Sequence, residues 1–487
     1  MADTLDYAQF PAAPLGSQGG FAGVRAWRRR ELAIGVSSAL AASVFACFPW
    51  SLALVGGLTI VGLAAAENEP FILTVIFLIP VGWIVNSDFP IKNVSVAIRI
   101  LVLAGFFLGR LMRGKLSGRE LLRPSITRAS LLFLCLAVGS NAWGGIGWSH
   151  ESWRSVYDLA AFIGFFMMLL TWMDSRRRIR TVLAILLYSA MGTAVFAIAQ
   201  EVAGGYTSLW LYLSPSGDEF DRWASRAPSF LNYSNSLAGY LDLILPFALA
   251  CCLLGKGRWK QLGGWATGLG VLALLCTQSL GGLAGFVAIL ILAVTCLAGS
   301  QRRRVILLTG ICAAVFLVYA QRGILSPAHT EEALGPDAMM RLLLWGTAWD
   351  LFLKSPVFGV GWGNFINLYG SYLTAFSDWI KPGVFGIHNI YLQLLAETGV
   401  AGCTSFFYLV VQVWRQAWGQ WRSSFDYLDR ALAFGVMGAL VSVLVHGLVD
   451  FLFQVSPQFG TLFWVLLALL VANGRLASWT EKGRPGA

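Results

Sequence analysis

The chain has 487 residues, of which 57% are hydrophobic and 12% are charged. Soluble domains carry roughly 25% charged residues, so this composition excludes a soluble globular protein and indicates an all-α protein with many membrane spans. The net charge of +10 would suit nucleic acid or an anionic surface, but in a membrane protein the question is where the positive residues lie.

Apolar runs follow one another along most of the chain. A spanning helix needs about 20 mainly apolar residues, and the sequence predicts fourteen candidate spans. The first two are short, and the alternative for them is a single re-entrant hairpin, which leaves about 12–14 transmembrane helices. The candidates are 31–48, 51–66, 71–87, 94–112, 129–146, 156–173, 181–202, 235–255, 262–279, 281–299, 304–320, 393–414, 431–452 and 457–474.

The lysines and arginines predict the orientation of these spans. The segment 1–30 has no clear cleavage site and is predicted to be a cytoplasmic tail. With that start, 26 of the 35 positive residues, including every large basic cluster, fall in cytoplasmic loops. The net positive charge is therefore explained by the orientation of the spans in the membrane, and no nucleic-acid partner is predicted. The nine positive residues outside are Lys92, Arg99, Arg154, Arg222, Arg226, Arg322, Arg341, Lys354 and Lys381.

This orientation divides the chain into five parts. A bundle over 31–320 carries a short outer loop at 203–234, and a large outer loop occupies 321–392. The last spans fill 393–474, and the tail 475–487 is cytoplasmic like the N-terminus. Two outer segments of this size give room for a site above the membrane.

The large outer loop contains a predicted amphipathic helix, MMRLLLWGTAWDLFLK (339–354). Arg341, Trp345, Ala348 and Phe352 recur at helical spacing and so share one face. Pro356 ends the helix, and GVGWGNF (359–365) is typical of a glycine-rich turn.

The loop ends in GIHNIYLQLLAETGVAG (386–402), where His388 and Asn389 stand at the outer mouth of the twelfth span. Asn389 is predicted to be the N-cap of that span. Glu397 lies one to two turns deeper and is expected to bind a neighbouring span. For His388 alone a purely structural role is the alternative, but its place beside Asn389 at a span entrance favours function.

Other polar residues lie at the same level. Arginine suits bidentate binding of phosphate, which makes Arg226 and Arg341 candidates to bind a diphosphate; the alternative is an interfacial anchor. His446 and Asp450 are four residues apart, which predicts that they share a helix face and either serve the reaction or lock the span to its neighbours.

The sequence predicts neither a metal site nor a cofactor. The eight cysteines lie in apolar runs without a C-x-x-C pair and are interpreted as small core residues. TQSLGGLAGF (277–286) is interpreted as a tight hairpin between two spans, with small residues that permit close packing and with no chemistry assigned.

Together, the segments 341–365 and 388–402 resemble the signature of the bacterial O-antigen ligase and O-antigen polymerase superfamily. RAPSFLNYSNSLAGYL (226–241) resembles the part of that family in which an arginine and an asparagine precede a span. This segment lacks the glycine commonly found between the arginine and the aromatic residue, so Arg222 is an alternative to Arg226. Fourteen spans also exceed the twelve usual for ligases.

The resemblance implies a GT-C-like glycosyltransferase that takes a glycan from undecaprenyl diphosphate on the periplasmic face of the bacterial inner membrane, without metal. It implies that His388 activates the acceptor hydroxyl and that Arg341 and Arg226 bind the carrier diphosphate. The expected acceptor is lipid A-core or another saccharide. The alternatives are an O-antigen or exopolysaccharide polymerase and, more distantly, a lipid-linked glycan transporter. A transporter would hold its polar groups near the bilayer midplane, whereas here they cluster in outer loops.

Overall fold

The computed structural model describes residues 49–81, 94–144, 146–203, 226–231, 233–297, 302–306, 308–310, 312, 336–372, 386–451, 453 and 456–482. Contacts divide the chain into two units, Met1–Gly62 and Leu63–Ala487. In the first unit the described part is a helical stretch that begins at Pro49. The candidate site described below lies in the second unit.

Throughout the described ranges, every regular element is helical, as the composition predicts. The helices are α2 (Pro49–Ala65), α3 (Glu69–Phe77), the 3-10 turn η1 (Ile79–Val81), α4 (Val94–Met112), α5 (Gly118–Leu122), α6 (Ser125–Trp143), α7 (His150–Trp172), α8 (Arg176–Val202), α11 (Ser234–Leu254), α12 (Arg258–Cys276), α13 (Leu280–Cys296), α15 (Pro336–Lys354), α16 (Phe365–Tyr372), α17 (Ile390–Ser423), α18 (Tyr427–His446) and α20 (Pro457–Lys482).

Within the described part of the chain, seven helices are long and apolar enough to cross a membrane: α6, α7, α8, α11, α17, α18 and α20. A sharply bent pair, Gly56–Ala65 and Glu69–Phe77, passes the same test as one broken span. The chain is thus a multi-pass membrane protein. The bend falls between the second and third predicted spans, and the predicted span 31–48 lies outside the described residues.

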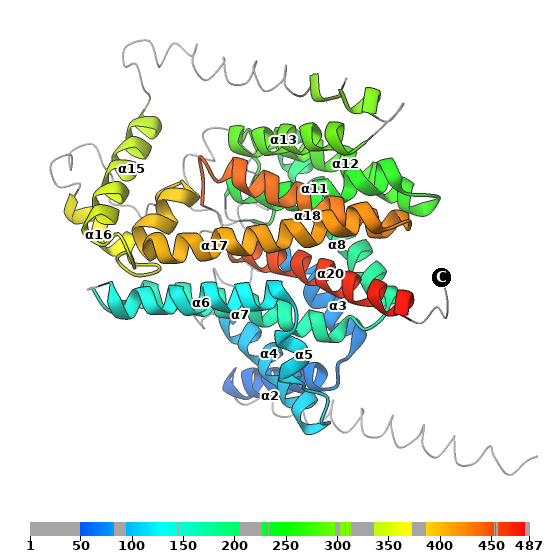
Figure 1. Ribbon diagram of the computed structural model, residues 1–487, viewed down its shortest axis with the longest axis horizontal. Coiled ribbons are helices and arrows are strands. Elements are labelled where there is room, and N and C mark those ends of the chain that lie inside the picture. Colours follow the sequence, from blue (N-terminus) through cyan, green and yellow to red (C-terminus); the bar gives the residue numbers. More distant parts are fainter. Residues whose placement is uncertain are drawn as a thin grey trace, which may run out of the picture. The chain divides into compact units, whose positions relative to one another are not determined.

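Helix α11 is central to the second unit and packs against α12, α13 and α18. It is buried on all sides from Ser236 to Cys251, as expected of an apolar helix in the middle of a bundle. Helix α17 packs between α6 and α18, and α20 packs against α7. Figure 1 shows α17 and α18 running side by side, with α6 on the other side of α17.

The predicted tight turn is present, because α12 ends at Cys276 and α13 begins at Leu280, although neither helix is among the seven that are long and apolar enough to cross a membrane. Glycines on α13 bring it close to its neighbours. A Cβ on Gly282 would lie 2.7 Å from the Cβ of Ala238, and one on Gly281 would lie 2.5 Å from the His446 ring. Small residues are thus required for this packing.

The amphipathic helix of the large loop is also confirmed, as α15. Its last residue is Lys354, two positions before Pro356, and Ala348 on the predicted face is fully buried. The glycine-rich segment after it is a turn that lies against α17. The amides of Val360 and Gly361 donate to the carbonyls of Ala396 and Glu397, at 2.9 Å each.

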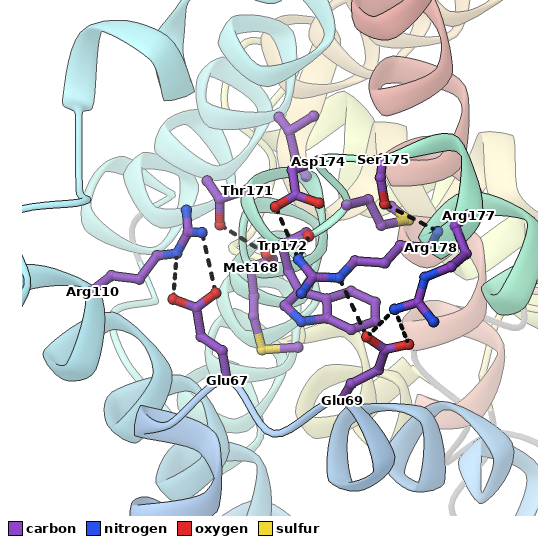
Figure 2. Close-up of polar contacts among 12 residues, drawn as sticks. Glu67, Glu69, Arg110, Met168, Thr171, Trp172, Asp174, Ser175, Arg177 and Arg178 are labelled. Carbon is purple, nitrogen blue, oxygen red and sulfur yellow. Dashed lines mark hydrogen bonds and ion pairs between the residues drawn. The ribbon is translucent and has the colours of Figure 1, made fainter. Parts of the chain in front are cut away.

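A cluster of ion pairs connects the turn before α3 to α4 and α8, and Figure 2 shows it. Arg110 of α4 donates to the Glu67 carboxylate at 3.1 and 3.2 Å. Arg177 of α8 binds Glu69 at 2.8 Å, and the guanidinium of Arg178 lies 4.8 Å from the centre of the Trp172 ring. The basic run after α7 is therefore paired with acidic side chains of neighbouring elements.

Candidate functional site

His388 lies two residues before α17, where the sequence predicts it. Asn389 is the N-cap of that helix, and its Oδ1 accepts from the amides of Tyr391 and Leu392 at 3.0 Å each, so the predicted cap is confirmed. The side-chain amide of Asn389 also donates to the carbonyl of Leu448 at 3.0 Å. Asn389 thus joins the start of α17 to the segment that follows α18.

His388 has a left-handed backbone, with φ at +53°, which is uncommon outside glycine. Contacts on both sides hold it there. The indole of Trp345 donates to the carbonyl of Ile387 at 2.9 Å, and the amide of Ile390 donates to the carbonyl of Gly447 at 2.7 Å. A strained backbone held by its neighbours is a mark of functional sites, and it fixes the direction of the imidazole.

The imidazole of His388 pairs with Asp450. Its Nδ1 lies 3.2 Å from Oδ1 of the carboxylate, and the His388 side chain is 27% exposed while Asp450 is buried. Burial acts to raise the pKa of Asp450, but the hydrogen bond and charge of His388, with the charges of His446 and Arg341, lower it to about 2. Asp450 is therefore ionised at neutral pH and pairs with Nδ1, which leaves Nε2 as the ring nitrogen that does not contact the carboxylate.

Arg341 of α15 lies beside this pair. Its guanidinium donates to the carbonyl of Val449 at 2.6 Å, one residue before Asp450. Trp345, one helical turn further along α15, makes the bond to Ile387 described above. The structure therefore brings Arg341, His388 and Asp450 together from three segments of the chain.

His446 and Asp450 do not share a helix face, contrary to the sequence prediction. Helix α18 ends at His446, and a turn follows, so the i, i+4 relation no longer places two side chains on one helix. Each residue pairs with another partner. His446 Nδ1 lies 2.9 Å from Oδ2 of Asp242 on α11, and both side chains are buried.

Glu397 is buried within α17, and its carboxylate accepts from the amide of Phe365 at 3.1 Å. This bond lies at the start of α16, a short helix of the large loop, whereas the sequence predicts a neighbouring span as the partner. Glu397 therefore helps to hold the glycine-rich turn against α17.

Arg226 precedes α11 and is held by two bonds. Its Nε donates to the carbonyl of Thr277 at 2.9 Å and its Nη2 to Oδ1 of Asn235 at 2.7 Å. These contacts join the start of α11 to the hairpin between α12 and α13, next to Gly281 and His446. Arg222 lies outside the described residues.

A cavity of about 470 Å³ reaches the two segments that carry His388 and Asp450. Gly386 and Phe451, each close in sequence to one member of the pair, line it. Its other walls come mainly from α6, α7, α16, α17, α20 and the glycine-rich turn before α16. Most of these residues are aromatic or aliphatic, including Phe133, Trp362 and Phe406. This volume lies in the usual range of small-molecule sites, roughly 300–1,000 Å³.

A family model described as O-antigen ligase matches residues 265–407. Over these residues the chain is similar to the O-antigen ligase superfamily. The matched segment runs from α12 into α17 and contains Arg341 and His388, whereas Arg226 and Asp450 lie outside it. No curated protein matches the chain. The members of this superfamily are membrane enzymes of the glycosyltransferase type, ligases or polymerases, that use lipid-linked glycans.

The sequence interpretation missed Asp242 and did not foresee Asp450 as the partner of His388. A signal was present for Asp242, because an acidic residue within a span is costly and is a functional candidate by default. The same signal marks Asp158 of α7, which binds Arg99 of α4 at 2.8 Å.

Proposed function

We propose that this O-antigen ligase homologue transfers a glycan from undecaprenyl diphosphate to a saccharide or lipid-linked acceptor, with inversion at the sugar C1. The observation that carries the proposal is the His388–Asp450 pair, held beside Arg341 at the edge of a cavity. Transfer of this kind needs a base for the acceptor and positive charge for the leaving group, and these residues supply both.

In the proposed reaction, Nε2 of His388 takes the proton of the acceptor hydroxyl while the oxygen attacks C1. The bond between C1 and the diphosphate oxygen breaks, and its electron pair stays with the diphosphate. Asp450 holds the imidazole through Nδ1 and stabilises the imidazolium that forms. General-base catalysis of this type contributes roughly 10²–10⁴ in rate.

Arg341, and Arg226 or Arg222, are proposed to bind the diphosphate and so to stabilise the charge that develops on it. Each preorganised donor of this kind is worth roughly 10²–10³ in rate. The proposed orientation has this end of the bundle on the periplasmic side of the bacterial inner membrane and both termini in the cytoplasm, and the distribution of lysine and arginine supports it. A carrier with a long apolar chain would then reach the site laterally from the lipid.

The test uses purified full-length protein with undecaprenyl diphosphate that carries a defined glycan. Products made with and without saccharide or lipid acceptors are identified by mass. We expect one glycan per acceptor, and a carrier-linked product of doubled length in the absence of acceptor would indicate a polymerase instead.

His388→Ala should abolish transfer and leave donor binding nearly intact, because the arginines bind the diphosphate. Tyr408→Ala is the control, because Tyr408 is 45% exposed on α17 and lies outside the cavity lining. Wild-type turnover in His388→Ala, or a complete loss of donor binding, would refute the role as base.

A further inference from the structure

The α7 side of the cavity is polar. Glu151, Arg154, Ser155 and Asp158 line it, and the spacing of four and three residues places Glu151, Ser155 and Asp158 on one face of the helix. Each carboxylate has an arginine nearby: Arg154 lies 3.9 Å from Glu151, and Arg99 lies 2.8 Å from Asp158. This wall therefore presents hydrogen-bonding oxygens without a surplus of positive charge.

Two indoles line the same cavity and lack partners. Trp362 and Trp464 are 4% and 2% exposed, and within the described part of the chain neither Nε1 donates a hydrogen bond. A buried donor without an acceptor is costly, and most such groups in folded proteins are paired. The cavity thus combines two indole donors that need acceptors with two carboxylates that are paired with arginines and can accept further hydrogen bonds.

These two requirements discriminate among ligands. A hydrocarbon chain satisfies neither the indoles nor the carboxylates. A diphosphate accepts hydrogen bonds but would meet Glu151 and Asp158 without excess positive charge. A sugar hydroxyl both donates and accepts, and the C–H faces of a sugar ring suit the aromatic walls at Phe133 and Phe451.

We infer that this cavity is a saccharide subsite, in which Trp362 and Trp464 donate to sugar oxygens and Glu151 and Asp158 accept from sugar hydroxyls. The inference builds on the proposed function. Gly386 and Phe451 place the subsite beside His388 and Asp450. The sugar bound there is either the first residue of the donor glycan or the acceptor.

The experiment measures the equilibrium binding of three probes to the full-length protein. The probes are bare undecaprenyl diphosphate, undecaprenyl diphosphate that carries a single hexose, and a free oligosaccharide acceptor. The variants are Trp362→Phe, which removes the N–H and keeps an aromatic ring, and Glu151→Gln at the half-buried rim. Trp265→Phe is the control, because Trp265 is 68% exposed on α12. Thermal unfolding is measured alongside.

We expect Trp362→Phe and Glu151→Gln to weaken binding of a sugar-bearing probe about fivefold each, the effect of one lost hydrogen bond, and to leave bare undecaprenyl diphosphate unchanged. A loss confined to the hexose-bearing carrier assigns the subsite to the donor, and a loss confined to the oligosaccharide assigns it to the acceptor. Unchanged affinity for both sugar probes, or equal loss for the bare carrier, overturns the inference. Because binding is measured without turnover, a wild-type protein that binds sugar but transfers none would refute the proposed function alone.

Discussion

The imidazole of His388 and the carboxylate of Asp450 meet at 3.2 Å, although 62 residues separate them in the chain. His388 precedes α17 and Asp450 follows α18, so the pair forms only when these two helices pack side by side. Asn389 strengthens the same junction through its bond to Leu448. The geometry of the proposed base therefore depends on how the helices associate.

Asp450→Asn should lower transfer by roughly 10²–10⁴, because the amide no longer stabilises the imidazolium. The loss should persist across the pH range, because the variant lacks the carboxylate that pairs with Nδ1 at every pH. Rates measured from pH 5 to 9 check this (~2 units either side of neutrality). A profile identical to that of the wild type would reduce Asp450 to a structural role.

The same carboxylate should contribute stability that depends on pH. Its pKa is lowered from 3.8 to about 2 in the folded protein, so folding favours the ionised form. The contribution is present in full above 3.8 and is lost as the pH falls towards 2. Thermal unfolding of wild type and Asp450→Asn in detergent should therefore converge at low pH. A constant difference over that range would contradict the assignment.

Arg341→Lys should weaken donor binding and transfer while membrane insertion stays normal. Lysine keeps the charge but loses the planar group that binds phosphate in two places and reaches the carbonyl of Val449. Arg415→Lys, at an exposed position near the other end of α17, is the control. Full activity of Arg341→Lys would show that Arg341 is only an interfacial anchor. The same substitution at Arg226 and at Arg222 would show which of these two residues binds the donor.

Gly399→Ala should destabilise the protein and reduce transfer. Gly399 has φ at +63°, and a Cβ there would lie 2.3 Å from the carbonyl oxygen of Val357. Such strain costs of order 1–3 kcal/mol. Gly419→Ala on the same helix is the control, because nothing lies within 4 Å of its added Cβ. Equal melting temperatures for the two variants would show that the turn does not depend on Gly399.

The predicted orientation is tested by single cysteines in a background without native cysteine. Leu448→Cys, 51% exposed after α18, should react with an impermeant reagent in intact spheroplasts. Phe425→Cys, exposed between α17 and α18, should react only after permeabilisation. The reverse pattern would invert the topology and place the His388 site in the cytoplasm.

Local features of the site could be predicted from the sequence. Asn389 is followed by a helical apolar run, which is enough to predict an N-cap, and the order of Lys354, Pro356 and the glycines predicts the end of α15 and the turn. These predictions succeed because the interactions that decide them lie within a few residues along the chain.

The pairing of the buried charged groups could not be predicted in the same way. Asp242 and His446 are 204 residues apart, and no spacing connects them. The short distance between His446 and Asp450 was misleading, because it indicates a shared face only if the helix continues, and α18 ends at His446. Such partners are decided by the packing of α11, α17 and α18.

The contact between the glycine-rich turn and α17 is made by main-chain atoms. Val360 and Gly361 donate to α17 carbonyls, and the amides of Val400 and Ala401 donate back to the turn. Main-chain hydrogen bonds do not depend on which side chain a residue carries. Exposed positions of the turn, such as Val357 at 57% exposure, should therefore accept many substitutions, provided that the glycines remain. Library selection across 356–363 should therefore retain the glycines and the buried Val360 and Trp362, and leave the exposed Val357 diverse.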